Sequence, residues 1–117
     1  MLRFALISCV LLSGTTAPVS AGDWRVLDDA GIAGSLAGKT VEYSGASQSF
    51  YVSGRTLYDS GRPSWGYWET RAGRYCSQWP PADGWACYGV EADGKGHVRF
   101  IGESGHVTEG RIVGTAD

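Results

Sequence analysis

Apolar and polar residues alternate along most of the chain after Gly38, with the period of two that is typical of β-strands. The segment Thr40–Ser44 places Val41 and Tyr43 on one side, and Gln48–Ser53 places Phe50 and Val52 on one side. Glycine-containing turn sequences separate most of the alternating segments. The predicted strands are 40–44, 48–53, 55–59, 65–70, 74–79, 85–91, 97–102 and 106–113.

This pattern predicts an all-β fold of about eight short antiparallel strands. Because tight turns join most neighbours, the strands should pair in sequence order as a meander. Closing the meander into a small barrel would leave no exposed strand edges. An open, bent sheet or a sandwich is the alternative architecture.

One short helix should precede the strands. Asp28-Asp29 can cap its start, Ile32, Ala33 and Leu36 give it one apolar side, and Gly38 ends it. The composition is otherwise rich in glycine and aromatic residues, which favours strands and turns. We therefore expect this helix to plug or flank one end of the barrel.

The first residues have the layout of a secretory signal peptide. Met1-Leu2-Arg3 is a positive start, Phe4–Leu12 is almost continuously apolar, and Val19-Ser20-Ala21 supplies the small residues that signal peptidase recognises. The apolar segment is too short to span a bilayer. We predict cleavage after Ala21, a single domain over residues 22–117, and a periplasmic or secreted location.

A lipoprotein signal is the competing interpretation. Leu6-Ile7-Ser8-Cys9 resembles a lipobox, in which Cys9 would carry the lipid. The apolar segment continues past Cys9, however, as Val10-Leu11-Leu12. We therefore expect Cys9 to be removed with the signal peptide.

The remaining two cysteines predict one disulfide bond. In an oxidising compartment, Cys76 and Cys87 have only one intramolecular pairing. They fall on two consecutive predicted strands, so they can face each other across a hairpin. Tyr75 and Tyr88 would then point to the opposite face. Closing a loop of this size stabilises a fold by about 3 kcal/mol in the chain-entropy model.

Charge argues against two classes of partner. Without Arg3 the domain has nine basic and twelve acidic residues, and it has no basic stripe. Sequence-independent nucleic-acid binding needs clustered positive charge, so we do not expect it. The chain also lacks a basic amphipathic helix, so we expect no stable membrane insertion after signal cleavage.

Two aromatic clusters are candidates for ligand or partner contact. In the first, alternation places Trp65 and Tyr67 on one face and Trp68 on the other, with Gly66 marking a close backbone contact or a bulge. Trp68 should fill the core, and Trp65 is a candidate contact.

The second cluster lies on the hairpin that holds both cysteines. Trp79 and Trp85 flank a stiff Pro80-Pro81 loop and could form an apolar lip for a ligand or partner, with Tyr88 nearby. The alternative is a purely structural, disulfide-stapled hairpin.

No catalytic or metal-binding pattern appears. His97 and His106 begin consecutive predicted strands, so they should lie at opposite ends of a hairpin, too far apart to share a metal. Ser104-Gly105-His106 lacks the context of a nucleophilic serine. The glutamates are scattered, and no pair of them suggests acid–base catalysis. We expect no enzyme activity, no metal and no cofactor.

The sequence resembles a group of small uncharacterised exported bacterial proteins. The most specific part is the Tyr-Cys…Trp…Cys-Tyr hairpin. The resemblance implies a periplasmic domain and leaves its activity open. The shared features are the signal peptide, a short helix into 36–41, Gly66-Tyr67-Trp68, Arg74-Tyr75-Cys76 with Trp79, Cys87-Tyr88-Gly89-Val90 and Val98-Arg99-Phe100.

Two other families share features with the chain. Gly66-Tyr67-Trp68 is similar to the Gly-x-Trp motif of calycin barrels such as lipocalins, where it opens the first strand. In outline the chain also resembles small periplasmic barrel inhibitors of secreted proteases. In that family an N-terminal segment enters the protease cleft, and the matching residues here would be 22–28, with Trp24 as the anchor.

The sequence therefore predicts a non-enzymatic periplasmic or secreted protein that binds a small ligand or a periplasmic protein. Inhibition of a periplasmic enzyme is the alternative function. An envelope-stress or structural role, or an enzyme, fits the residues less well.

Overall fold

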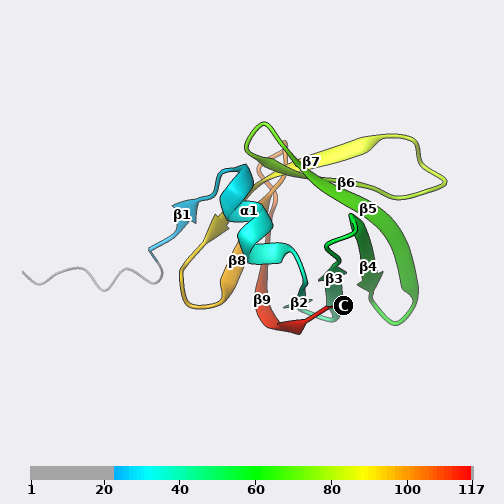
Figure 1. Cartoon of the computed structure of the whole chain (residues 1–117), viewed down its shortest axis with the longest axis horizontal. Helices are drawn as coiled ribbons and strands as arrows, with labels where there is room; N and C mark the ends of the chain where they lie inside the picture. The colour runs from blue at the N-terminus through cyan, green and yellow to red at the C-terminus, as the bar shows by residue number, and fades with distance from the viewer. Residues whose placement is uncertain (1–22, 117) are drawn as a thin grey trace, which may run out of the picture.

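Eight antiparallel strands close into a barrel in the computed structural model, which describes residues 23–116 (Figure 1). Each strand pairs with the next one in sequence, and β2 also pairs with β9, which closes the ring. The predicted all-β meander barrel is confirmed. Its strands are β2 (Lys39–Tyr43), β3 (Ala46–Phe50), β4 (Arg55–Asp59), β5 (Pro63–Arg71), β6 (Arg74–Gln78), β7 (Trp85–Ala92), β8 (His97–Ile101) and β9 (Val107–Thr115).

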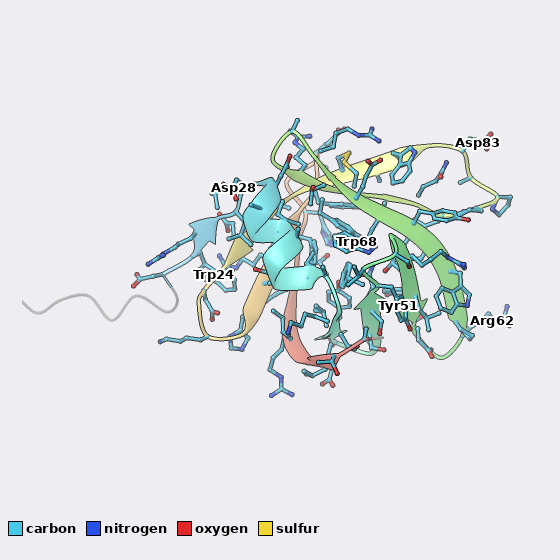
Figure 2. All side chains as sticks on the ribbon, in the orientation of Figure 1. Trp24, Asp28, Tyr51, Arg62, Trp68 and Asp83 are labelled. Carbon is cyan, nitrogen blue, oxygen red and sulfur yellow. A yellow bond between two sulfur atoms is a disulfide. The ribbon has the colours of Figure 1, made fainter. Side chains whose placement is uncertain are left out.

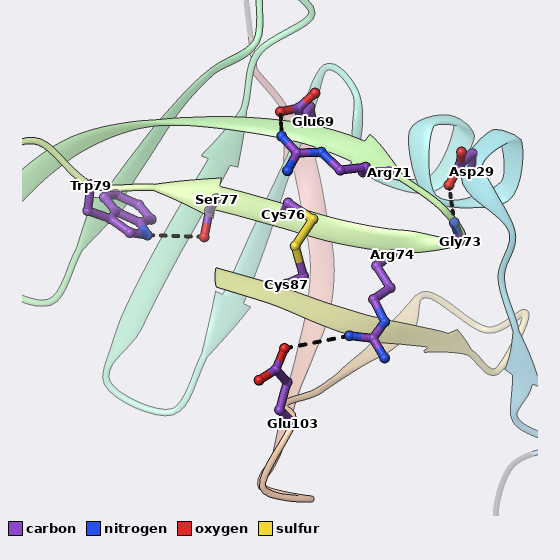
Figure 3. Close-up of a disulfide and its surroundings, with 10 residues drawn as sticks. All are labelled: Asp29, Glu69, Arg71, Gly73, Arg74, Cys76, Ser77, Trp79, Cys87 and Glu103. Atoms are coloured by element: carbon purple, nitrogen blue, oxygen red, sulfur yellow. Dashed lines mark hydrogen bonds and ion pairs between the residues drawn. A yellow bond between two sulfur atoms is a disulfide. The ribbon is translucent and has the colours of Figure 1, made fainter. Parts of the chain in front are cut away.

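The predicted helix is present as α1 (Asp29–Leu36). The Asp28 side chain caps it by accepting a hydrogen bond from the Gly31 amide at 2.8 Å. Ile32 and Leu36 are fully buried, so the helix closes one end of the barrel. Asp29 accepts a hydrogen bond from the amide of Gly73, which ties the helix to the turn between β5 and β6 (Figure 3).

One short strand was not expected from the sequence. β1 (Arg25–Val26) pairs with the end of β7, beyond the residues that pair with β6. The amide of Leu27 continues this pairing by donating to the Val90 carbonyl at 2.9 Å. A strand of two residues has no alternation from which it could be recognised.

The predicted limits of β3 were wrong. The strand begins at Ala46, because Gly45 adopts a positive φ of 75° and turns the chain directly after β2, and it ends at Phe50. Val52 therefore does not share the inward face with Phe50: its side chain is 82% exposed, in the connection to β4.

The apolar core fills the half of the barrel next to α1. The ring of Phe50 lies at its centre, with ring centroids at 5.6 Å from both Trp68 and Tyr75. Figure 2 shows Trp68 directed into the barrel, as alternation predicted. The core comprises Ile32, Leu36, Val41, Phe50, Trp68, Tyr75, Val90, Val98 and Phe100.

The predicted disulfide joins Cys76 on β6 to Cys87 on β7 (Figure 3). The two cysteines are direct partners in the register of these strands, as are Tyr75 and Tyr88. The tyrosines line the barrel interior, on the face opposite the disulfide. The predicted disulfide across a hairpin is confirmed.

Within residues 23–116, no helix has the length and apolar character needed to cross a membrane. The predicted signal peptide, its cleavage after Ala21 and the alternative at Cys9 lie outside the described residues.

Candidate functional site

A cavity of about 600 Å³ lies at the end of the barrel opposite α1. In Figure 2 the loops that carry Arg62 and Asp83 lie at the far side of the molecule from Asp28 and Trp24. The volume falls within the usual range of small-molecule sites, about 300–1,000 Å³. The cavity is lined by Tyr43, Ser44, Gln48, Tyr58, Ser64, Tyr75, Ser77, Trp79, Tyr88, Phe100, His106, Val107, Thr108 and Glu109.

Aromatic rings from five different strands and one loop form a continuous arc around this cavity. Each ring contacts the next, with neighbouring centroids 5.2 to 6.4 Å apart. These separations are typical of favourable aromatic pairs. In order, the rings of the arc belong to Trp79, Tyr58, Tyr43, Phe100, Tyr75 and Tyr88.

Gln48 organises the floor of the cavity from the middle of β3. Its amide nitrogen donates to the Tyr75 hydroxyl at 2.9 Å and to the Thr56 hydroxyl at 3.0 Å. Its amide oxygen accepts a hydrogen bond from the Tyr43 hydroxyl at 2.9 Å. The Thr56 hydroxyl in turn donates a hydrogen bond to the carbonyl of Ser49 at 2.8 Å. The network therefore connects β2, β3, β4 and β6 and fixes two rings of the arc.

Burial keeps the phenols of the floor neutral. Desolvation raises the pKa of Tyr43 well above its usual value, and the neighbouring phenols of Tyr75 and Tyr58 raise it further. Desolvation also raises the pKa of Tyr75 to about 12, although hydrogen bonds with Ser77 and Gln48 oppose the shift. Both hydroxyls are therefore neutral at physiological pH, in an environment that disfavours negative charge.

Trp79 turns inward at the end of β6 and joins the arc. Its indole nitrogen donates to the Ser77 hydroxyl at 3.1 Å (Figure 3). Its ring lies over Gly66, where a Cβ atom would come within 2.7 Å of the indole. The close backbone contact predicted at Gly66 is thus present, and it makes room for Trp79.

The structure places the four predicted contact residues in three locations. Trp79 and Tyr88 line the cavity. Trp85 lies outside the cavity, with the Arg71 guanidinium 5.3 Å from its ring centroid. It lines a separate hollow, which shares Tyr88 and His106 with the cavity. Trp79 and Trp85 therefore do not form one continuous lip.

Trp65 lies on the outer face of β5, away from the cavity. Its side chain is 47% exposed, and the Arg55 guanidinium lies 4.8 Å from its ring centroid. Tyr51 and Tyr67 extend this outer aromatic patch, since Tyr51 packs against Trp65 and the same guanidinium covers Tyr67.

Four central residues of the cavity were not identified as site residues from the sequence. Alternation gave the direction of Tyr43, since it shares a side with Val41, but Tyr58 and Phe100 showed no site signal of their own. Gln48 showed none either, because a glutamine in a strand normally faces solvent.

The two histidines lie in different surroundings. His97 Nδ1 lies 2.7 Å from the Asp93 carboxylate, in the turn before β8. His106 lines the mouth of the cavity. Across residues 23–116, no group of three or more histidine, cysteine or acidic side chains is arranged to hold a metal ion.

The N-terminal segment that was compared with protease inhibitors is part of the sheet. The Trp24 ring lies 3.7 Å from the Arg99 guanidinium, and β1 pairs with β7. Residues 24–27 are therefore held along the barrel wall.

Comparison with models of protein families, with curated proteins and with solved structures found no match.

Proposed function

We propose that this protein is an exported, non-enzymatic binding protein that holds a small ligand in the cavity of its barrel. The observation that carries this proposal is the continuous arc of six aromatic rings around a cavity of about 600 Å³. Aromatic walls with a few fixed polar groups are typical of small-molecule sites.

The architecture supports a binding role because the two ends of the barrel differ. Buried Ile32 and Leu36 of α1 fill one end, while the opposite end keeps its cavity. A barrel that served only as a stable shell would gain free energy by filling this space with side chains.

The test is a search for bound small molecules in the purified oxidised protein by native mass spectrometry, together with a thermal-shift screen of a metabolite library. Trp79→Ala should weaken binding of any ligand found, because this ring belongs to the arc. Trp85→Ala is the matched control, since it removes the other tryptophan of the same hairpin, outside the cavity. Equal binding by both variants would contradict the proposal.

Export is supported by the disulfide between Cys76 and Cys87, which persists in oxidising compartments. N-terminal sequencing of the protein from a cell-envelope fraction should begin at Gly22. A protein that starts at Met1 and stays with the cytosolic fraction would contradict this part of the proposal.

Binding of a protein partner is the second candidate. It is favoured by the exposed outer patch of Trp65, Tyr67 and Arg55. Affinity capture from a periplasmic extract tests it, because Trp65→Ala should lose a partner bound there and Trp79→Ala should keep it.

A further inference from the structure

The lining of the cavity carries no permanent positive charge. It contains no lysine or arginine. Glu109 belongs to the lining but is exposed in β9, where its cross-strand partner is Arg99. An anionic ligand would therefore be buried without a permanent counter-charge, which is costly in free energy.

Several hydrogen-bond donors at the floor are already used within the protein. Both amide protons of Gln48 are donated, to Thr56 and Tyr75. The Tyr43 hydroxyl donates to Gln48, and the Trp79 indole donates to Ser77. Tyr75 and Ser77 accept two of these bonds, so a ligand at the floor meets neutral hydroxyl groups and aromatic rings and no charged donor of lysine or arginine.

The ring faces carry partial negative charge. Each aromatic ring has a quadrupole that is negative over its face, and a cation within about 6 Å of the centroid is attracted to it. The arc from Trp79 to Tyr88 surrounds the cavity with six such rings. Burial raises the pKa of Tyr43 at the floor, and a cation is attracted more strongly to a ring that is shielded from water.

We propose that the cavity binds a small organic cation whose charge lies on an alkylated ammonium group. This inference rests on the proposed ligand-binding function and names the ligand class for the same site. An alkylated ammonium fits better than a primary amine, because it has a weaker hydration shell to lose on entering the cavity. Its alkyl groups also bury apolar surface against the rings.

The experiment compares three probes of matched shape in titration calorimetry with the purified oxidised protein. They are choline, its uncharged carbon analogue 3,3-dimethylbutan-1-ol, and the anion 3,3-dimethylbutanoate. Choline should bind at least about tenfold more tightly than the alcohol, as expected for desolvated cation–π contacts, and the anion should not bind. Trp79→Ala should weaken choline binding by about tenfold, whereas Trp85→Ala should leave it unchanged.

The outcomes separate the ligand class from the function. If the alcohol or the anion binds as tightly as choline, the cation inference is wrong, while binding that depends on Trp79 still supports a ligand-binding cavity. If none of the three binds and the library screen finds a Trp79-dependent ligand without an ammonium group, the inference is again wrong and the function stands. If neither experiment finds a Trp79-dependent ligand, both proposals are wrong.

Discussion

Trp79 lies on the backbone of Gly66, so closely that a Cβ atom on this glycine would come within 2.7 Å of the indole and 2.6 Å of the Gln78 carbonyl oxygen. Gly66 lies in the middle of β5, and Trp79 follows the end of β6. The absence of a side chain at Gly66 therefore lets the Trp79 ring lie where it does. The arc of rings around the cavity depends on this contact.

Gly66→Ala should therefore both destabilise the barrel and disturb the cavity. The added methyl group clashes with the indole and with the backbone of β6, and such overpacking costs about 1–3 kcal/mol. Urea unfolding measures the loss, and tryptophan fluorescence reports the displaced indole. Gly84→Ala in the neighbouring loop is the control, because its Cβ would meet no atom within 4 Å. If the two variants have equal free energies of unfolding, the close contact between Gly66 and Trp79 does not constrain the barrel.

Gln48→Ala should be among the most destabilising polar substitutions in the barrel. It removes a hydrogen-bond partner of three hydroxyls, those of Tyr43, Thr56 and Tyr75, and leaving buried polar groups unpaired costs about 1–3 kcal/mol. Chemical denaturation measures the change. Ser47→Ala, one residue earlier on β3, should change stability by less than about 0.5 kcal/mol. A loss for Gln48→Ala no larger than this would mean that the network does not stabilise the barrel.

Stability should fall at high pH because of the buried phenols. The folded-state pKa of Tyr75 is raised from 10.0 to about 12, and that of Tyr43 is raised as well. Unfolded tyrosines ionise from about pH 10, so the stabilisation is complete below pH 10 and is lost as the pH rises through the folded-state value. For Tyr75 the loss is on the order of 2 kcal/mol.

Urea midpoints measured from pH 9 to 12 test this dependence. Tyr75→Phe lacks the ionisable group and should show a shallower decline above pH 10 than the unmodified protein. A parallel decline in both proteins would show that Tyr75 ionises at the same pH in the folded and unfolded chains.

Replacing both cysteines by alanine should lower the free energy of unfolding by about 3 kcal/mol, because the disulfide closes a loop across the hairpin of β6 and β7. Thermal unfolding with and without reductant measures the effect. The reductant should lower the Tm of the unmodified protein and leave that of the double variant unchanged. A reductant effect of equal size in both would point to a cause other than this bond.

Alternation predicted the barrel because most strands have one buried side, as Val41 and Phe100 illustrate. It failed at β3, where the small polar residues Ser47 and Ser49 flank a buried glutamine. There the turn at Gly45 sets the register, and Phe50 keeps its inward place while Val52 does not.

The cavity could be predicted only in part. Tyr75 and Tyr88 were placed on one face because they neighbour the paired cysteines. The sequence could not show that Trp79 lines the cavity while Trp85 lies outside it. Trp79 follows the end of β6, and the direction of its side chain depends on the space left by Gly66 in β5. Gln48 became central because three strands bring hydroxyl partners to it.

The pairing of β9 with β2 joins segments from near opposite ends of the described chain. Until β9 has docked, the outer edges of β2 and β8 expose rows of backbone groups that other chains can extend. Contacts between such distant segments also form slowly, so the half-assembled barrel should be the stage at which the protein is most prone to self-association. Protection against misassembly therefore depends on how fast β9 docks between β2 and β8.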